Sequence, residues 1–152
     1  MKLISIVSVL LLSLQVFALE VGSAIPELKL NDQFEKPIKV AADTKVLIFV
    51  ADKKPSKTLS DYLTESKYDL TAKKVVYISD ISKMPSMISS MFAKPAMKKY
   101  HYNVALDEAG DETKSWPRQT DKVTIMTLKN QKISQVQYLQ TKEEIEKFFK
   151  AL

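Results

Sequence analysis

Two short apolar segments separated by a helical pattern restrict the fold of this chain more than any other feature. Residues 46–50 (VLIFV) and 75–78 (VVYI) are apolar at every position, which is typical of strands buried on both faces of a sheet. Between them, Leu59, Tyr62 and Leu63 form one apolar stripe at helical spacing. A strand, a helix and a strand of this length predict a crossover between two parallel strands.

The segment after the second strand carries a longer apolar stripe. Five residues recur at i, i+3, i+4, i+7 and i+8, namely Met84, Met87, Ile88, Met91 and Phe92. This spacing predicts a helix with one apolar face, and packing of that face in the core is the favoured interpretation. Pro95 predicts a break or kink before the last turn of this helix.

The C-terminal part of the chain predicts a hairpin and a helix. The hairpin strands are expected over residues 123–128 and 132–139, with a bulge near Ser134, where the apolar phase shifts. Residues 141–144 (TKEE) form a capping box. They precede a terminal helix whose predicted buried stripe comprises Ile145, Phe148, Phe149 and Leu152.

These elements together predict an α/β fold. Alternating residues predict an N-terminal β-hairpin over residues 27–30 and 36–40, and another strand over residues 102–106. Strands that alternate with helices and end in a hairpin and a helix indicate a three-layer sandwich, with a central mixed β-sheet flanked by helices.

The first residues are typical of a targeting segment. Met1 and Lys2 give a basic start, and the apolar run over residues 3–14 is shorter than the roughly 20 residues of a spanning helix. We predict a cleavable signal peptide over residues 1–18 and a single domain over residues 19–152, periplasmic or secreted. No stable membrane insertion is expected after cleavage, and an uncleaved anchor is the alternative.

Composition excludes several functional classes. None of the 152 residues is cysteine, so the chain can neither form nor exchange a disulfide. Its two glycines, Gly22 and Gly110, are too few and too far apart for a Gly-rich phosphate loop. The net charge of +5 is interspersed along the chain, which does not favour nucleic-acid binding.

The ordered set of elements resembles the thioredoxin-like fold, in the form found in peroxiredoxins and secreted thiol-disulfide proteins. The segments that carry the resemblance are VGSAIPELKLNDQFEKPIKV, YNVALDEAGDETKSW and the closing VTIMTLKNQKISQVQYLQTKEEIEKFFKAL. The resemblance implies an attacking cysteine at the turn after the central strand, but Lys54 or Ser56 occupies its place. It also implies a cis-proline near residues 121–123, where the chain reads Asp-Lys-Val. Both halves of the redox site are therefore missing.

The chain is also similar to a group of small, uncharacterised exported proteins of bacterial type that share the hairpin turn Asp-Gln-Phe-Glu-Lys. Some members of that group carry a flavin-dehydrogenase label. The Gly-rich phosphate turn of dinucleotide-binding proteins is absent from this sequence, so the residues themselves do not support that label.

The turn after the first buried strand, residues 52–56 (DKKPS), contains a candidate anion site. The N–H groups at a helix start attract anions, and Lys53, Lys54 and the Ser56 hydroxyl would strengthen that attraction. The alternative is that the lysines are solvated and Asp52 or Ser56 caps the helix.

Two further patterns contain possible metal ligands. Met84, Met87 and Met91 precede the single histidine, His101, and thioethers suit Cu(I); core packing of the methionines is the alternative. The acidic residues 107–112 supply oxygen ligands but lack the alternating spacing of a calcium loop, which favours a solvated turn.

The sequence thus predicts an exported, redox-inactive thioredoxin-like domain. We expect a binding or accessory module of the cell envelope, without a cofactor, whose partner is an envelope protein or a small anionic ligand. The alternative is a cofactor-dependent oxidoreductase, in which flavin or copper supplies the chemistry that cysteine cannot.

Overall fold

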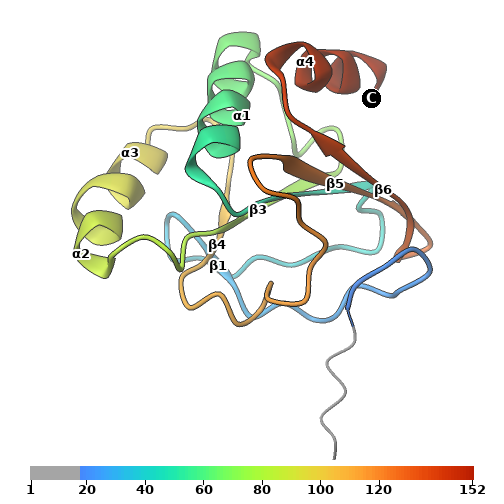
Figure 1. Cartoon of the computed structure of the whole chain (residues 1–152), viewed down its shortest axis with the longest axis horizontal. Coiled ribbons are helices and arrows are strands. Elements are labelled where there is room, and N and C mark those ends of the chain that lie inside the picture. The colour runs from blue at the N-terminus through green and yellow to red at the C-terminus, as the bar shows by residue number, and fades with distance from the viewer. Residues whose placement is uncertain (1–17) are drawn as a thin grey trace, which may run out of the picture.

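The computed structural model describes residues 18–152, so residues 1–17 of the predicted signal peptide lie outside it. One mixed sheet has the strand order β1-β4-β3-β2-β5-β6 (Figure 1). Its strands are β1 (Asn31–Asp32), β2 (Val46–Val50), β3 (Val75–Asp80), β4 (Ala105–Asp107), β5 (Val123–Lys129) and β6 (Lys132–Leu139). The helices are α1 (Lys53–Ser66), α2 (Ser86–Ile88), the π-helical η1 (Ser89–Ala93), α3 (Lys94–Met97) and α4 (Lys142–Ala151).

Strand pairing confirms the predicted parallel crossover and the closing hairpin. β2 pairs in parallel with β3, which pairs in parallel with β4, whereas β5 runs antiparallel to both β2 and β6. In the β5–β6 ladder, Thr127 pairs with Gln135 and Leu128 with Ile133. Ser134 is therefore the extra residue of a bulge, at the position where the apolar phase shift predicted one.

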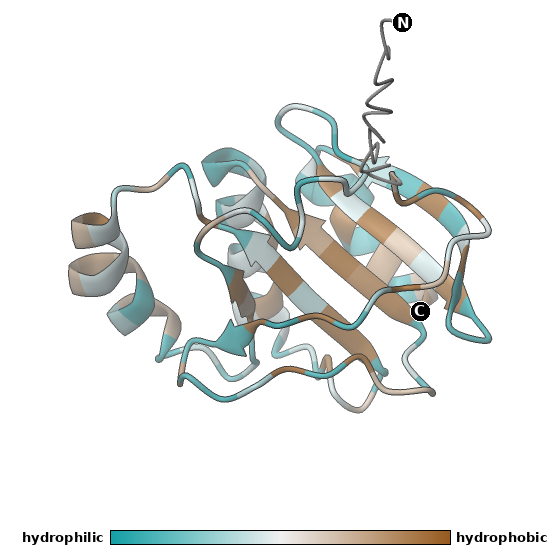
Figure 2. Ribbon diagram, turned by 90° about the horizontal axis from the view of Figure 1, so that it is seen from below, coloured by the Kyte–Doolittle hydropathy of each residue, from teal (hydrophilic) through white to brown (hydrophobic). Residues whose placement is uncertain are grey.

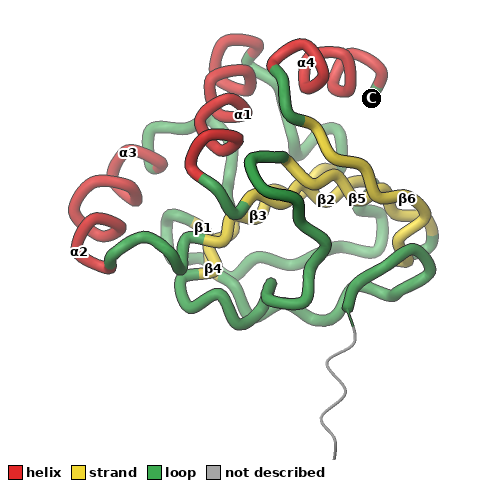
Figure 3. The backbone as a smooth tube through the Cα atoms, viewed as in Figure 1, coloured by secondary structure: helices red, strands yellow, loops and turns green. Residues whose placement is uncertain are grey.

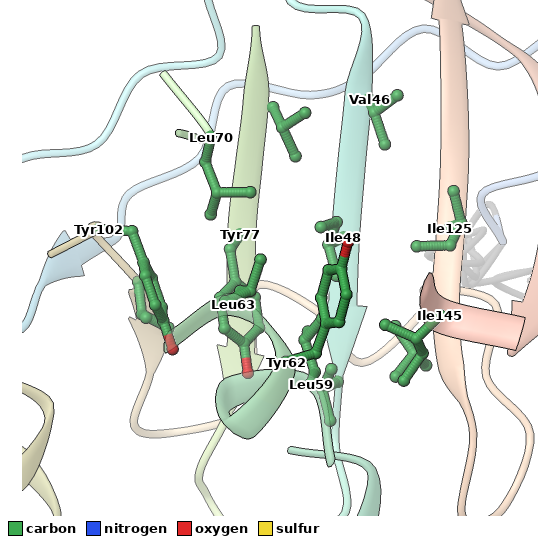
Figure 4. Close-up of a cluster of buried hydrophobic side chains, with 14 of the residues drawn as sticks. Val46, Ile48, Leu59, Tyr62, Leu63, Leu70, Tyr77, Tyr102, Ile125 and Ile145 are labelled. Atoms are coloured by element: carbon green, nitrogen blue, oxygen red, sulfur yellow. The ribbon is translucent and has the colours of Figure 1, made fainter. Parts of the chain in front are cut away.

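The side chains of β2 alternate between two separate cores. Val46 and Ile48 face a core that includes residues of α1 and α4, and Figure 4 shows this cluster between the sheet and the helices. Leu47 and Phe49 face a second core, which Trp116 completes. In Figure 3 the helices α1 and α4 lie on one side of the sheet, and loops run along the other. The predicted α/β class with a central mixed sheet is confirmed.

The N-terminal hairpin is shorter than predicted. Its arms meet through hydrogen bonds from the Asp32 N–H to the Lys36 carbonyl (2.8 Å) and from the Ile38 N–H to the Leu30 carbonyl (2.9 Å). Regular strand structure is limited to β1, which pairs with β4. Pro37 has no N–H group to extend a ladder, and Leu30 instead packs in the second core.

The strand predicted over residues 102–106 begins later, at Ala105. Upstream of it, the Val104 N–H donates to the Gln33 side-chain oxygen (2.8 Å), and the Gln33 amide donates to the Tyr102 carbonyl (2.8 Å). A buried glutamine therefore replaces a strand partner at this point. The ring of Tyr102 stacks on that of Tyr100 in the core below α1.

The predicted burial of the methionine stripe is wrong. Met87, Ile88, Met91 and Phe92 are all exposed, and Ser89 faces inward instead. Pro95 lacks the N–H group that would continue α-helical bonding, and the Lys94 N–H donates to the Ser89 carbonyl in the i→i+5 pattern of a π-helix. Met87, Ile88, Met91 and Phe92 keep the i, i+1, i+4, i+5 spacing of one helix face, so the helical period holds and the error lies in which face is covered.

The terminal helix α4 begins as predicted. The Thr141 hydroxyl accepts from the Glu144 N–H, and the Glu144 carboxylate accepts from the Thr141 N–H, which completes the capping box. Ile145 and Phe149 are buried, while Phe148 and Leu152 are only partly covered at the edge of the core.

Among residues 18–152, no helix combines the length and the apolar character needed to cross a membrane.

Candidate functional site

Three aspartates lie together at the edge of the sheet where the parallel strands end. Asp80 and Asp107 are the last residues of β3 and β4, and Asp52 follows β2 by two residues. Because β2, β3 and β4 are parallel neighbours, their carboxyl ends share one edge, which is where α/β sheets hold their ligands. We call these three residues the carboxylate edge.

The Asp52 carboxylate connects the start of α1 to the loop before β5. One oxygen accepts from the Asp121 N–H (3.0 Å), and the other accepts from the Lys83 ammonium group (3.1 Å). The bond from Asp121, more than the Lys83 charge, lowers the pKa of Asp52 below its usual value despite partial burial. The ionised Asp52 carboxylate therefore links the start of α1 to the loop before β5 through a residue 69 positions away in the sequence.

The Asp80 carboxylate is paired with Arg118, the only arginine in the chain. The Arg118 guanidinium donates to Asp80 (3.0 Å) and to the Thr113 carbonyl, and it lies 4.9 Å above the Phe49 ring. A planar fork can make two hydrogen bonds and stack at once, which a lysine cannot do. Burial raises the pKa of Asp80, but the Ser82 hydroxyl and N–H, together with Arg118, outweigh it and leave that pKa below its usual value.

Asp107 organises the acidic turn that follows β4. Its carboxylate accepts from the Gly110 N–H, the Thr113 N–H and the Thr113 hydroxyl, each at 2.8 Å. Gly110 has φ +77°, and a Cβ there would lie 2.6 Å from the Ser82 hydroxyl oxygen, so only glycine fits without rearrangement. The expectation of a solvated turn is wrong for Asp107, which is 2% exposed.

The three carboxylates act as hydrogen-bond acceptors for neighbouring loops. Each of the six carboxylate oxygens of the carboxylate edge accepts a hydrogen bond from within the described chain. With lowered pKa values, Asp52 and Asp80 are ionised at neutral pH and have no proton to donate as general acids. The three aspartates therefore hold the connections after β3 and after β4 in place at the edge where α/β sheets hold their ligands.

Two of the three residues of the candidate anion site are accessible to an anion. Lys53 and Lys54 are exposed in the first turn of α1, while Ser56 is half-buried with its hydroxyl beside the buried phenol of Tyr77. Asp52 occupies the N-cap position but makes no side-chain capping hydrogen bond, because its carboxylate is directed to Asp121 and Lys83. The two lysines thus remain the predicted anion contacts, and Ser56 faces the protein interior.

The candidate copper ligands are spread from before α2 to beyond α3. Met87 and Met91 are exposed, Met84 is half-buried before α2, and His101 lies beyond the end of α3. The His101 Nε2 atom is 3.2 Å from the Tyr68 carbonyl, and its ring meets Tyr102 edge-on. Within residues 18–152, no group of three or more histidine, aspartate or glutamate side chains is placed to hold a metal ion.

Sequence reasoning missed the carboxylate edge and its arginine. Two signals were available: an aspartate ends two of the three parallel strands and follows the third by two residues, and one arginine stands among 23 basic residues. Neither signal has a helical or strand period, so a search for apolar patterns does not find them.

Comparison with known proteins identifies the fold through structure alone. No family model matches the chain, and no curated protein matches its sequence. Among solved structures, a putative thiol:disulfide interchange protein DsbE from Chlorobium tepidum matches with a TM-score of 0.60 and 16% identity, covering 88% of this chain and 98% of that one. A peroxiredoxin-like protein from Aquifex aeolicus matches with a TM-score of 0.56 and 15% identity, covering 89% of each chain.

An uncharacterized thioredoxin-like protein from Porphyromonas gingivalis matches with a TM-score of 0.53 and 20% identity, covering 84% of this chain and 90% of that one. The fold is thioredoxin-like. At these sequence identities the similarity establishes the fold alone. This thioredoxin-like chain lacks the cysteines that the resemblance implied.

We predict that Arg118→Lys destabilises the thioredoxin-like domain by about 1 to 2 kcal/mol, because lysine cannot keep both hydrogen bonds and the contact with Phe49. Urea unfolding followed by circular dichroism measures the change. Lys114→Arg, an exposed substitution of the same type in reverse, is the control and is expected to have no effect. Equal stability of Arg118→Lys and wild type would show that the guanidinium fork is dispensable.

We predict that Asp52→Asn lowers the free energy of unfolding by about 1 to 2 kcal/mol at pH 7. The pKa of Asp52 is lowered in the folded state, so its contribution is present above the unfolded pKa of about 3.9 and is lost as pH falls through the folded value. The difference between variant and wild type should therefore shrink below about pH 4. Exposed Asp111→Asn is the control, and a pH-independent difference would contradict the electrostatic explanation.

We predict that sulfate or phosphate raises the melting temperature of the wild type more than that of Lys53→Ala/Lys54→Ala. Loss of both ammonium groups removes the charge that attracts an anion to the start of α1. Thermal unfolding in matched sulfate and chloride series measures the response, with Lys129→Ala/Lys132→Ala as a control for general charge effects. An identical salt response in all three proteins would eliminate the anion site.

Proposed function

We propose that this chain is an exported thioredoxin-like domain that performs no thiol-disulfide exchange and acts as a binding or accessory module in the cell envelope. The observation that carries the proposal is the start of α1, where the resemblance implies a reactive cysteine. That turn carries two exposed lysines and an aspartate whose carboxylate is tied to the Asp121 N–H. The predicted signal peptide supports the location.

Thiol-disulfide exchange requires a thiolate, and a hydroxyl or an ammonium group cannot replace it. The loop before β5 is also held in place by a hydrogen bond within the chain. The Asp121 N–H donates a hydrogen bond to the Asp52 carboxylate. Asp121 itself has φ +57°, a strained conformation for a residue other than glycine. A loop held in this way supports a fixed surface better than a site that accepts a passing substrate strand.

The accessible features of this edge suit recognition of an anionic partner. Lys53 and Lys54 are exposed beside the positive end of the α1 dipole. A small anionic ligand or an acidic surface of an envelope protein is therefore the partner chemistry that we propose for this edge.

We predict that the purified domain does not reduce insulin with dithiothreitol beyond the uncatalysed rate and does not consume peroxide. Lys53→Cys/Ser56→Cys places two thiols three residues apart in the first turn of α1, where the helix start lowers a thiol pKa. This variant should gain measurable insulin reduction, which checks that the assay and the scaffold are competent.

Turnover by the wild-type protein would contradict the proposal. An absorbance spectrum of protein purified from its native compartment tests the alternative class, in which flavin or copper carries out redox chemistry. A flavin band or stoichiometric copper would replace the binding module with a cofactor-dependent oxidoreductase.

A further inference from the structure

The segment from α2 to α3 presents its large apolar side chains to solvent. Met87 is 68% exposed, Ile88 43%, Met91 62% and Phe92 63%. We call these four residues the apolar ridge. Figures 1 and 2 place this helical segment at one end of the molecule, apart from α1 and α4.

The orientation of this segment is the reverse of that of an ordinary surface helix. Ser89, a small polar residue, is 4% exposed and faces the protein, and Ala93 beside it is half-buried. Surface helices normally turn their apolar stripe inward and their polar residues outward. Single exposed apolar residues are common, but contiguous exposed ones mark an interaction site. The apolar ridge is therefore the candidate interaction surface of the described chain.

The charge around the apolar ridge restricts the choice of partner. Residues 81–106 contain four lysines and no aspartate or glutamate. Lys83 and Lys94 pair with Asp52 and Glu108, which lie outside this segment. Lys98 and Lys99 are exposed at the end of α3, and no acidic side chain of the described chain lies within ion-pair distance of either. The charge of this segment therefore favours a partner surface that is anionic as well as apolar.

A second copy of this chain does not meet these requirements. It would bring the same lysines together, and like charges oppose association. A stable protein interface also buries about 800 Å² on each partner, whereas the apolar ridge offers four side chains on one short helical segment. Shallow insertion into a lipid surface needs no complementary pocket. It requires an apolar helix face with neighbouring basic residues.

We propose that the apolar ridge inserts into the surface of an anionic membrane, with Lys98 and Lys99 contacting the lipid phosphates. Met87, Met91 and Phe92 would lie at the boundary between head groups and acyl chains, and the ammonium groups would remain in the head-group layer. This attachment is peripheral and reversible. The identity of the membrane rests on the proposed export, but the binding itself does not depend on whether the domain has redox activity.

The test uses the chain beginning at Leu19, which contains every helix and strand of the described fold and lacks the signal segment. Flotation with vesicles of phosphatidylcholine alone, and of phosphatidylcholine mixed with phosphatidylglycerol, measures binding. We expect wild type to bind the anionic vesicles and to dissociate at high salt. Met91→Ser/Phe92→Ser should weaken binding by about tenfold or more, because two inserted side chains are lost.

Two matched controls separate specific from general effects. Val21→Ser removes an exposed apolar residue elsewhere and should leave binding unchanged. Lys98→Glu/Lys99→Glu should weaken binding about tenfold or more, whereas Lys129→Glu/Lys132→Glu makes the same charge change at the β5–β6 turn and should have a smaller effect. All of these side chains are exposed, so the fold should persist, and circular dichroism verifies it.

Three results would overturn the proposal. The first is an absence of binding to anionic vesicles, which would leave an acidic protein surface as the occupant of the apolar ridge. The second is binding that Met91→Ser/Phe92→Ser does not weaken. The third is a dimer in vesicle-free solution that this variant dissociates, which would identify a second copy as the partner. None of these results bears on the insulin-reduction assay, so the two proposals fail separately.

Discussion

The burial of β2 on both faces is the constraint on which the rest of the structure depends. All five of its residues are buried, with alternate side chains assigned to the helix-covered core and to the loop-covered core. A strand in this position must have neighbours on both edges, and β3 and β5 supply them. Its end therefore has a fixed position, and the start of α1 and Asp52 are fixed with it.

Hydrogen-bonded carboxylates surround that fixed position. Asp52, Asp80 and Asp107 each accept a hydrogen bond from the single connection between β4 and β5, which is thereby held against the sheet. The edge where many α/β proteins bind substrates thus serves as an anchor in this chain. Lys53 and Lys54 are exposed beside this edge, while the apolar ridge lies elsewhere.

Sequence patterns predicted the elements that depend on local periodicity or capping. The parallel pairing of β2 with β3 follows from the order strand, helix, strand. The bulge at Ser134 and the start of α4 at its capping box follow from spacing along a single element. The exposure of the apolar ridge could not be predicted in this way, because periodicity identifies an apolar face but not whether that face packs against the protein. The contact between Arg118 and Asp80 spans 38 residues and depends on strand order, which no local pattern reveals.

The division of the core into two faces also separates the chromophores of the protein. The only tryptophan, Trp116, packs edge-on against Phe49 on the loop-covered face, with ring centroids 5.3 Å apart. Five of the six tyrosines lie in or against the helix-covered core: Tyr62, Tyr68, Tyr77, Tyr100 and Tyr102. Tryptophan emission therefore reports on the loops, and tyrosine absorbance reports on the helix layer. Without any introduced label, a single unfolding experiment can reveal whether the two halves of the core melt together.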